Sequence, residues 1–183
     1  MLRLAEPDVR YQASYLAALA ELTEEGNARY LDLVLPPEPG FAGSAFTAQA
    51  LADPGTFEAF CAYTIALAHP ETPRPAGWVT GTYLWMLDDD DVVGRISLRH
   101  MLTPWLLEVG GHIGYAVRPS ARRKGHASRA LTLMLPVAAA RGIDPVLVTC
   151  DEDNVASRRV IERAGGVLED LRGDKLRFWV PTT

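Results

Sequence analysis

A chain of 183 residues with 48% hydrophobic composition has room for one domain with a sizeable core and is too short for two domains of typical size. Its formal net charge of −5 argues against general nucleic-acid binding, and its two cysteines, Cys61 and Cys150, are too few for a disulfide framework. Because it has no signal-like apolar start and no run of about 18 apolar residues, we expect one soluble cytoplasmic domain over residues 1–183, with no membrane or nucleic-acid partner.

The first 25 residues predict a short strand followed by an amphipathic helix. Leu2 and Leu4 alternate with Arg3, as in a half-buried strand. Over residues 8–25 apolar positions recur every three or four residues, which places them on one helical face. These positions are Tyr11, Tyr15, Leu16, Leu19 and Leu22.

Residues 26–66 predict a loop and a second helix. Proline and glycine recur through residues 36–43 and exclude a regular helix or strand there. The loop over residues 35–43 is either a flap over a site or a surface connection, and the sequence leaves both alternatives open. Asp53-Pro54 is typical of an N-cap followed by the first helical residue, and an apolar stripe follows it.

Two segments rich in β-branched and aromatic residues, 78–87 and 92–98, predict a β-hairpin. Its turn carries consecutive aspartates, Asp88 to Asp91. Such carboxylates point in different directions, so we expect a solvated turn rather than a metal site. A connection over residues 100–108 leads to a further strand over residues 110–117.

The chain then becomes strongly basic. No acidic residue occurs between Glu108 and Asp144, whereas basic residues crowd the turn after Pro119: they are Arg118, Arg122, Arg123, Lys124 and Arg129. Small and apolar positions recur at helical spacing from Ala127, so the next helix begins inside this loop. Free amides at a helix start, the helix dipole and the close approach allowed by Gly125 favour a phosphate or pyrophosphate site. A solvated basic turn that only caps the helix is the alternative.

The last third of the chain predicts a helix, a buried strand, a second helix and a closing hairpin. Pro136 interrupts the first helix, where we expect a kink or a local repair, and Gly142 ends it. Residues 146–150 form an apolar strand, and Asn154 is placed to cap the helix behind it. We expect the inner face of that helix to comprise Ala156, Val160, Ile161 and Ala164. Residues 167–171 and 176–180 complete an α/β fold with a mixed sheet.

The loop Arg122-Arg123-Lys124-Gly125-His126-Ala127 resembles the Arg/Gln-x-x-Gly-x-Gly/Ala loop of the GNAT superfamily of N-acetyltransferases, which holds the pyrophosphate of acetyl-coenzyme A. The resemblance covers about residues 92–180, because the strand, helix, strand and asparagine-capped helix follow in the family's order. It implies the GNAT-like acyl-CoA N-acyltransferase fold, with a mixed, splayed sheet flanked by helices. In that fold the strands over residues 114–117 and 146–150 run parallel and separate to accommodate the cofactor.

The same resemblance implies which residues bind acetyl-CoA, and it implies no metal. The main chain of residues 115–117 would pair with the pantetheine arm, amides of residues 123–128 would meet the pyrophosphate, and Asn154 would contact the arm or position its helix. The implied set is Tyr115, Ala116, Val117, Arg122, Arg123, Lys124, Gly125, His126, Ala127, Ser128, Asn154 and Ser157.

Acyl transfer to an amine needs a neutral amine, a donor for the oxyanion and a proton for the departing thiolate. The resemblance assigns the oxyanion to a main-chain N–H near Val117. The candidate bases are Glu108, His112 and Glu152, with a chain of waters as the alternative.

The proton donor departs from the family pattern. Many members have a tyrosine seven residues after the matching asparagine, and this chain has Ile161 there. Tyr115 on the cofactor strand is the remaining candidate donor, although the alternation of the strand could equally bury it in the core. Ser157 and Cys150 are weaker candidates.

We therefore predict an N-acetyltransferase that transfers an acetyl group directly from acetyl-CoA to a primary amine. The acceptor, a small molecule or a protein amine, is undecided, although an acidic surround from Glu108 and the Asp88–Asp91 turn would suit a cationic amine. A non-catalytic acyl-CoA-binding module is the alternative, because the phosphate loop is intact beside the missing tyrosine. A nucleotide-phosphate enzyme is disfavoured, since no Gly-x-x-x-x-Gly-Lys-Ser/Thr loop occurs. A homodimer rests on family grounds only.

Overall fold

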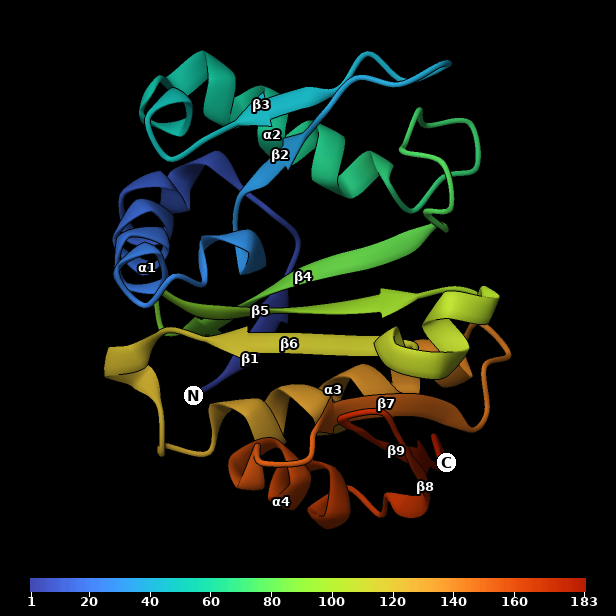
Figure 1. The fold of residues 1–183 in the computed structure, drawn as a ribbon. Helices are drawn as coiled ribbons and strands as arrows, with labels where there is room; N and C mark the ends of the chain where they lie inside the picture. Colours follow the sequence, from blue (N-terminus) through green and yellow to red (C-terminus); the bar gives the residue numbers. More distant parts are fainter.

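Seven strands form one mixed sheet in the computed structural model, which describes residues 1–183 (Figure 1). Their order across the sheet is β1-β4-β5-β6-β7-β9-β8, and every neighbouring pair is antiparallel except β6 with β7. The strands are β1 (Arg3–Ala5), β4 (Gly81–Asp88), β5 (Asp91–Arg99), β6 (Ile113–Val117), β7 (Val146–Asp151), β8 (Val167–Arg172) and β9 (Lys175–Val180). The α/β fold with a mixed sheet is thus confirmed.

Helices cover both faces of the sheet (Figure 1). On one face lie α1 (Gln12–Glu24) and α2 (Pro54–Ala66), and on the other lie α3 (His126–Ala139) and α4 (Val155–Arg163). The alternation of side chains along β4 accounts for the two cores. Trp85 packs with its ring centroid 4.6 Å from that of Tyr15 on α1, while the next residue, Met86, belongs to the cluster that includes Met134 of α3.

The predicted caps are confirmed at two helices. Asp53 accepts a hydrogen bond from the Thr56 amide at 2.8 Å at the start of α2. Asn154 accepts one from the Ser157 amide at 3.0 Å at the start of α4. Both caps satisfy amides that a helix start otherwise leaves free.

The proline-rich loop differs in one respect from the prediction. It joins two short antiparallel strands, β2 (Leu33–Leu35) and β3 (Ser44–Phe46), and Glu38 pairs with Phe41 in an isolated bridge within it. Gly43 permits the close return, because its φ is +83° and a Cβ there would lie 2.9 Å from the Leu35 carbonyl oxygen. Three-residue strands are too short to be recognised from alternation alone.

Several boundaries also differ. The strand expected from residue 78 begins at Gly81, and the one expected from residue 110 begins at Ile113, because a π-helical turn, η4 (Leu106–Gly110), precedes it. Short 3-10 turns are η1 (Val9–Tyr11), η2 (Ala28–Tyr30), η3 (Ala50–Ala52) and η5 (Pro119–Ala121). Helix α3 continues through Pro136, whose carbonyl still accepts a hydrogen bond from the Ala140 amide at 3.0 Å. Ala156 was expected on the inner face of α4 and is exposed.

The parallel strands β6 and β7 separate, as predicted. They share one register pair, Ile113 with Val148. Just before it, the His112 amide donates to the Leu147 carbonyl at 2.7 Å, and the Leu147 amide donates to His112 Nδ1 at 2.8 Å. Beyond Ile113 the edge of β6 that faces β7 has no strand partner. No helix has the length and apolar character that a membrane crossing requires.

Gly94 allows β5 and β6 to pair closely, which gives a first prediction. A Cβ at Gly94 would lie 2.2 Å from the Ala116 carbonyl oxygen, so backbone would have to move. We expect Gly94→Ala to lower the free energy of unfolding by about 3 kcal/mol, measured by urea denaturation. Gly55→Ala in α2 is the matched control: its Cβ would meet nothing closer than 3.4 Å, so stability should change by less than about 1 kcal/mol. Equal losses in both variants would contradict this account.

Candidate active site

The start of α3 is an array of free main-chain donors. Gly125 is the N-cap, with a left-handed φ of +84°, and no side chain caps the helix. The amides of residues 123–128 donate to no protein acceptor. A hollow of about 500 Å³ lies beside them, lined in part by Lys124, Gly125, His126 and Arg129. Free amides at a helix start together with nearby cations are the features of a phosphate site.

The basic residues of this loop divide into two groups. Arg118 and Arg122 bind carboxylates at the C-terminal end of α1: Arg118 Nε donates to Glu21 at 2.8 Å, and Arg122 Nη1 donates to the C-cap residue Glu25 at 2.7 Å. Arg123, Lys124 and Arg129 are exposed and form no ion pair. Of the predicted anion ligands, Arg122 therefore attaches the loop to α1, whereas the exposed group can meet a phosphate. His126 is buried.

Glu21 gives a second prediction, because it joins α1 to this loop. Its carboxylate accepts from Arg118 and also from the Ser120 amide at 2.9 Å, and these bonds lower its pKa from 4.5 to about 2. A depressed folded pKa stabilises the protein above pH 4.5, and that stabilisation is lost as the pH falls towards 2. Since the pair is partly exposed, we expect Glu21→Gln to cost about 1 to 2 kcal/mol at pH 7.

Urea denaturation at pH 7, 5 and 3 measures this loss, which should shrink between pH 4.5 and the folded pKa of about 2. Glu24→Gln is the control, because Glu24 lies exposed on the same helix and has no ion pair. A loss that is independent of pH would show that the carboxylate is not the stabilising group.

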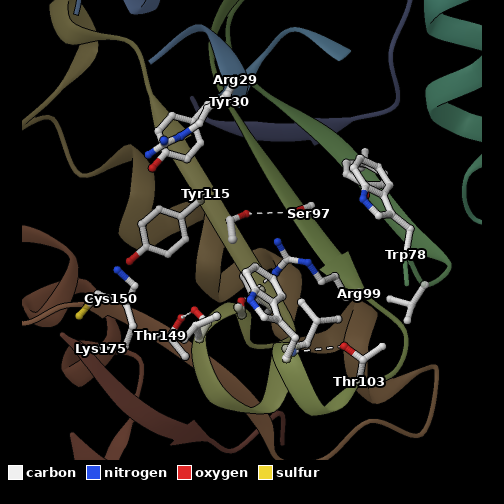
Figure 2. Close-up of a pocket in the computed structure, with 18 of the residues that line it drawn as sticks. Arg29, Tyr30, Trp78, Ser97, Arg99, Thr103, Tyr115, Thr149, Cys150 and Lys175 are labelled. Atoms are coloured by element: carbon white, nitrogen blue, oxygen red, sulfur yellow. Dashed lines mark hydrogen bonds between the residues drawn. The ribbon is translucent and has the colours of Figure 1, made fainter. Parts of the chain in front are cut away.

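The main cavity, of about 1060 Å³, opens where β6 and β7 separate (Figure 2). Its walls come from β4, β5, β6, β7, the start of α4, η2, η4 and the segment over residues 76–79. Figure 2 shows Tyr115 on one side with Cys150 and Lys175, Trp78 on the opposite side, and Arg99 between them. Segments that lie far apart in the sequence thus form one chamber.

Tyr115 lies between the separated strands and α4. Its hydroxyl and the Ser157 Oγ are 2.8 Å apart, and burial raises the pKa of the Tyr115 phenol to about 12. The phenol is therefore protonated at neutral pH and faces the cavity. Burial also raises the pKa of the Cys150 thiol, which disfavours a nucleophilic thiolate. Ile161, which stands at the position of the family's tyrosine, is fully buried in the core.

None of the three candidate bases lines the cavity. Glu108 lies on η4 and its side chain pairs with Arg172. His112 is buried, its Nδ1 accepts the Leu147 amide, and burial lowers its pKa to about 4, so its ring is neutral and engaged in the sheet. Glu152 is exposed beyond the end of β7.

The charge of the cavity is the opposite of what we expected. Glu108 and the Asp88–Asp91 turn do not line it, so the expected acidic surround is absent. The lining cations are Arg29, Arg95, Arg99 and Lys175, and Asp151 is the one lining acid. The sequence contains one feature that could have indicated a cationic cavity. Polar residues occupy alternate positions of the strand, with apolar residues between them: Arg95, Ser97 and Arg99. No group of three or more His, Cys, Asp or Glu side chains is placed to hold a metal ion.

Comparisons with known proteins agree with this geometry. The model of the acetyltransferase (GNAT) domain family matches residues 38–167, while no curated protein matches the sequence. The microcin C7 self-immunity acetyltransferase MccE, solved with acetyl-CoA and AMP, is 12% identical, with a TM-score of 0.64 over 98% of this chain and 92% of that one.

Two other solved structures share the fold. RimJ of Mycobacterium smegmatis, in complex with CoA-disulfide, is 17% identical, with a TM-score of 0.64 over 98% of this chain and 81% of that one. The Salmonella typhimurium acetyl transferase that modifies the N-terminal serine of ribosomal protein L7/L12 is 17% identical, with a TM-score of 0.56 over 97% and 92% of the two chains. At these sequence identities the structural similarity establishes the fold alone.

Proposed function

Because the chain belongs to the GNAT family of acetyltransferases, we propose that it transfers the acetyl group of acetyl-CoA directly to the primary amine of an acceptor. The observation that carries the proposal is the run of unpaired amides at the start of α3, which leads into the space between two parallel strands that have separated. The first feature fits a pyrophosphate, and the second leaves the main chain of β6 free to pair with an extended ligand.

We assign the cofactor contacts from these features. The amides of residues 123–128 hold the pyrophosphate, assisted by the exposed Arg123 and Lys124. The free edge of β6, over Tyr115, Ala116 and Val117, pairs with the pantetheine arm. Asn154 acts through its cap of α4, which sets the helix and Ser157 beside that arm.

The bound thioester supplies an activated acyl group. The acceptor nitrogen forms the new bond to its carbonyl carbon, and the bond to sulfur breaks. In this proposal the Tyr115 hydroxyl gives its proton to the departing sulfur, and Ser157 orients the phenol through their 2.8 Å contact. Since none of Glu108, His112 and Glu152 lines the cavity, water carries the amine proton away.

A thiol-release assay tests the activity. The protein is incubated with acetyl-CoA and primary amines, free thiol is measured by a colour reagent, and the acetylated amine is identified by mass spectrometry. We expect release that depends on the amine and exceeds hydrolysis. Stabilisation by acetyl-CoA without release for any amine would favour the acyl-CoA-binding module, the alternative motivated by the replacement of the family's tyrosine by the buried Ile161.

A further inference from the structure

Strand β5 presents a row of cationic and polar side chains to the cavity. Arg95, Ser97 and Arg99 occupy alternate positions and all line it, whereas Ile96 and Leu98 point into the core on the other face. Positions in the middle of a sheet that is covered on both faces are ordinarily apolar. Two arginines at such positions need a partner that compensates their charge.

Arg99 lies against the strand on which we place the cofactor. Its Nη1 donates to the carbonyl oxygens of Gly110 at 2.8 Å and Gly111 at 3.1 Å, and it forms no ion pair with a carboxylate. The guanidinium lies against Gly114, since a Cβ there would be in ordinary contact, 3.8 Å, with both terminal nitrogens. The cation therefore lies against Gly114 on β6, and no carboxylate of the protein forms an ion pair with it.

Arg95 has fewer direct protein contacts still. Its guanidinium carbon lies 5.6 Å from the ring centroid of Tyr83, and its side chain forms no hydrogen bond or ion pair. Burial raises the pKa of Asp32 and the charge of Arg95 opposes that rise, but the Asp32 carboxyl forms no ion pair with Arg95 and does not line the cavity.

The charge of Arg95 repels that of Arg99, and burial together with this repulsion lowers the pKa of Arg99. The acid that lines the cavity, Asp151, is already paired with Lys175. An anion entering between the two arginines would relieve their mutual repulsion and gain charge-assisted hydrogen bonds.

The size and lining of the cavity suit a small acceptor. A chamber of about 1060 Å³ exceeds what the end of a pantetheine arm fills and leaves space for a further small molecule. Aromatic side chains flank that space: Figure 2 shows Tyr30 and Trp78, and Tyr83 and Trp105 also line the cavity.

We propose that the acceptor is a small primary amine that also carries an anionic group, a carboxylate or a phosphate, received by Arg95 and Arg99. This inference rests on the proposed acetyltransferase function and deepens it. The anion anchors the acceptor at β5, and its amine then reaches the thioester held along β6.

Matched pairs of amines test the proposal. Free amino acids, including tryptophan, tyrosine and glutamate, are compared with their decarboxylated amines, and O-phosphoethanolamine is compared with ethanolamine, all with acetyl-CoA in the thiol-release assay. We expect kcat/KM to be about 100-fold higher for the anionic member of at least one pair. Comparing the amino-acid pairs with the phosphoethanolamine pair shows whether the site prefers a carboxylate or a phosphate.

Arg95→Met removes the charge, retains the length of the side chain and breaks no hydrogen bond with the protein. We expect it to lower kcat/KM for the anionic amine about 100-fold and to bring the ratio within the pair close to one. Arg141→Met, at an exposed arginine outside the cavity, is the control and should behave as the wild type. The rise in melting temperature with acetyl-CoA should persist in both variants.

The outcomes separate this inference from the proposed function. Equal turnover of both members of every pair, turnover of peptides alone, or an unchanged preference in Arg95→Met would overturn the inference and leave the acetyltransferase intact. Stabilisation by acetyl-CoA without turnover of any amine would overturn the inference together with the enzymatic activity. Absence of both stabilisation and thiol release would refute the cofactor site itself.

Discussion

Replacing Gly125 by aspartate should abolish the stabilisation that acetyl-CoA gives the wild-type protein. At a ligand concentration about 100 times the dissociation constant, binding adds roughly 2.7 kcal/mol, or about 5 to 10 °C in a chain of this size. Gly125 has a φ of +84° and open space where its Cβ would be, and aspartate tolerates this left-handed conformation better than most residues. The new carboxylate would lie among the free amides of residues 123–128, where it occupies donors and repels a pyrophosphate.

Gly125→Asn is the matched control, because asparagine has nearly the same shape and the same tolerance of a left-handed backbone without the charge. Thermal unfolding of all three proteins, with and without acetyl-CoA, measures the effect. We expect Gly125→Asn to keep most of the shift. If both variants lose it equally, a side chain of any kind blocks the site. If neither loses it, the pyrophosphate binds elsewhere.

Removing the Tyr115 hydroxyl should affect turnover more than binding. We expect Tyr115→Phe to lower kcat about 100-fold, the lower end of what a positioned acid contributes, with little change in KM for acetyl-CoA, since the ring that lines the cavity remains. Because the pKa of the phenol is raised to about 12, this group should cause no loss of wild-type activity between pH 7 and pH 10. Steady-state kinetics over that range, with melting temperatures as a check of folding, measure both quantities.

Ser157→Ala is the companion variant. It leaves the phenol in place and removes the Oγ that lies 2.8 Å from it, so we expect a loss of only a few-fold. An equal loss in the two variants would indicate that Ser157 itself donates the proton. Wild-type kcat in Tyr115→Phe would show that the thiolate leaves without a proton from this residue.

The candidate cofactor site could be located from the sequence because its signals are local. Gly125, the basic residues around it and the start of α3 lie within a few positions of one another, and Asn154 caps the helix that immediately follows β7. Backbone conformation, capping and helix dipoles act over such short separations. The separation of β6 from β7 was implied by the family resemblance, and the single register pair confirms it.

The proposed acceptor site could not be located in the same way. Tyr83, Arg95, Trp105 and Tyr30 come from four segments, and the cavity they share exists only after β4, β5 and β6 have paired in their observed register. For this reason the expected acidic surround was wrong: Glu108 is close to β6 in sequence, but its partner Arg172 is 64 residues away.

The fold class, the order of elements, the caps and the candidate anion-binding loop could be predicted from the sequence, because each depends on periodicity or conformation within a few neighbouring residues. The polar contacts around the proposed acceptor site depend on the tertiary structure. His112 illustrates the difference, since a histidine ahead of a strand is free to act as a base until the Leu147 amide, from a distant strand, engages its Nδ1. Side-chain function depends on which partners compete for each polar atom, and those partners are brought together by strand pairings between distant parts of the chain.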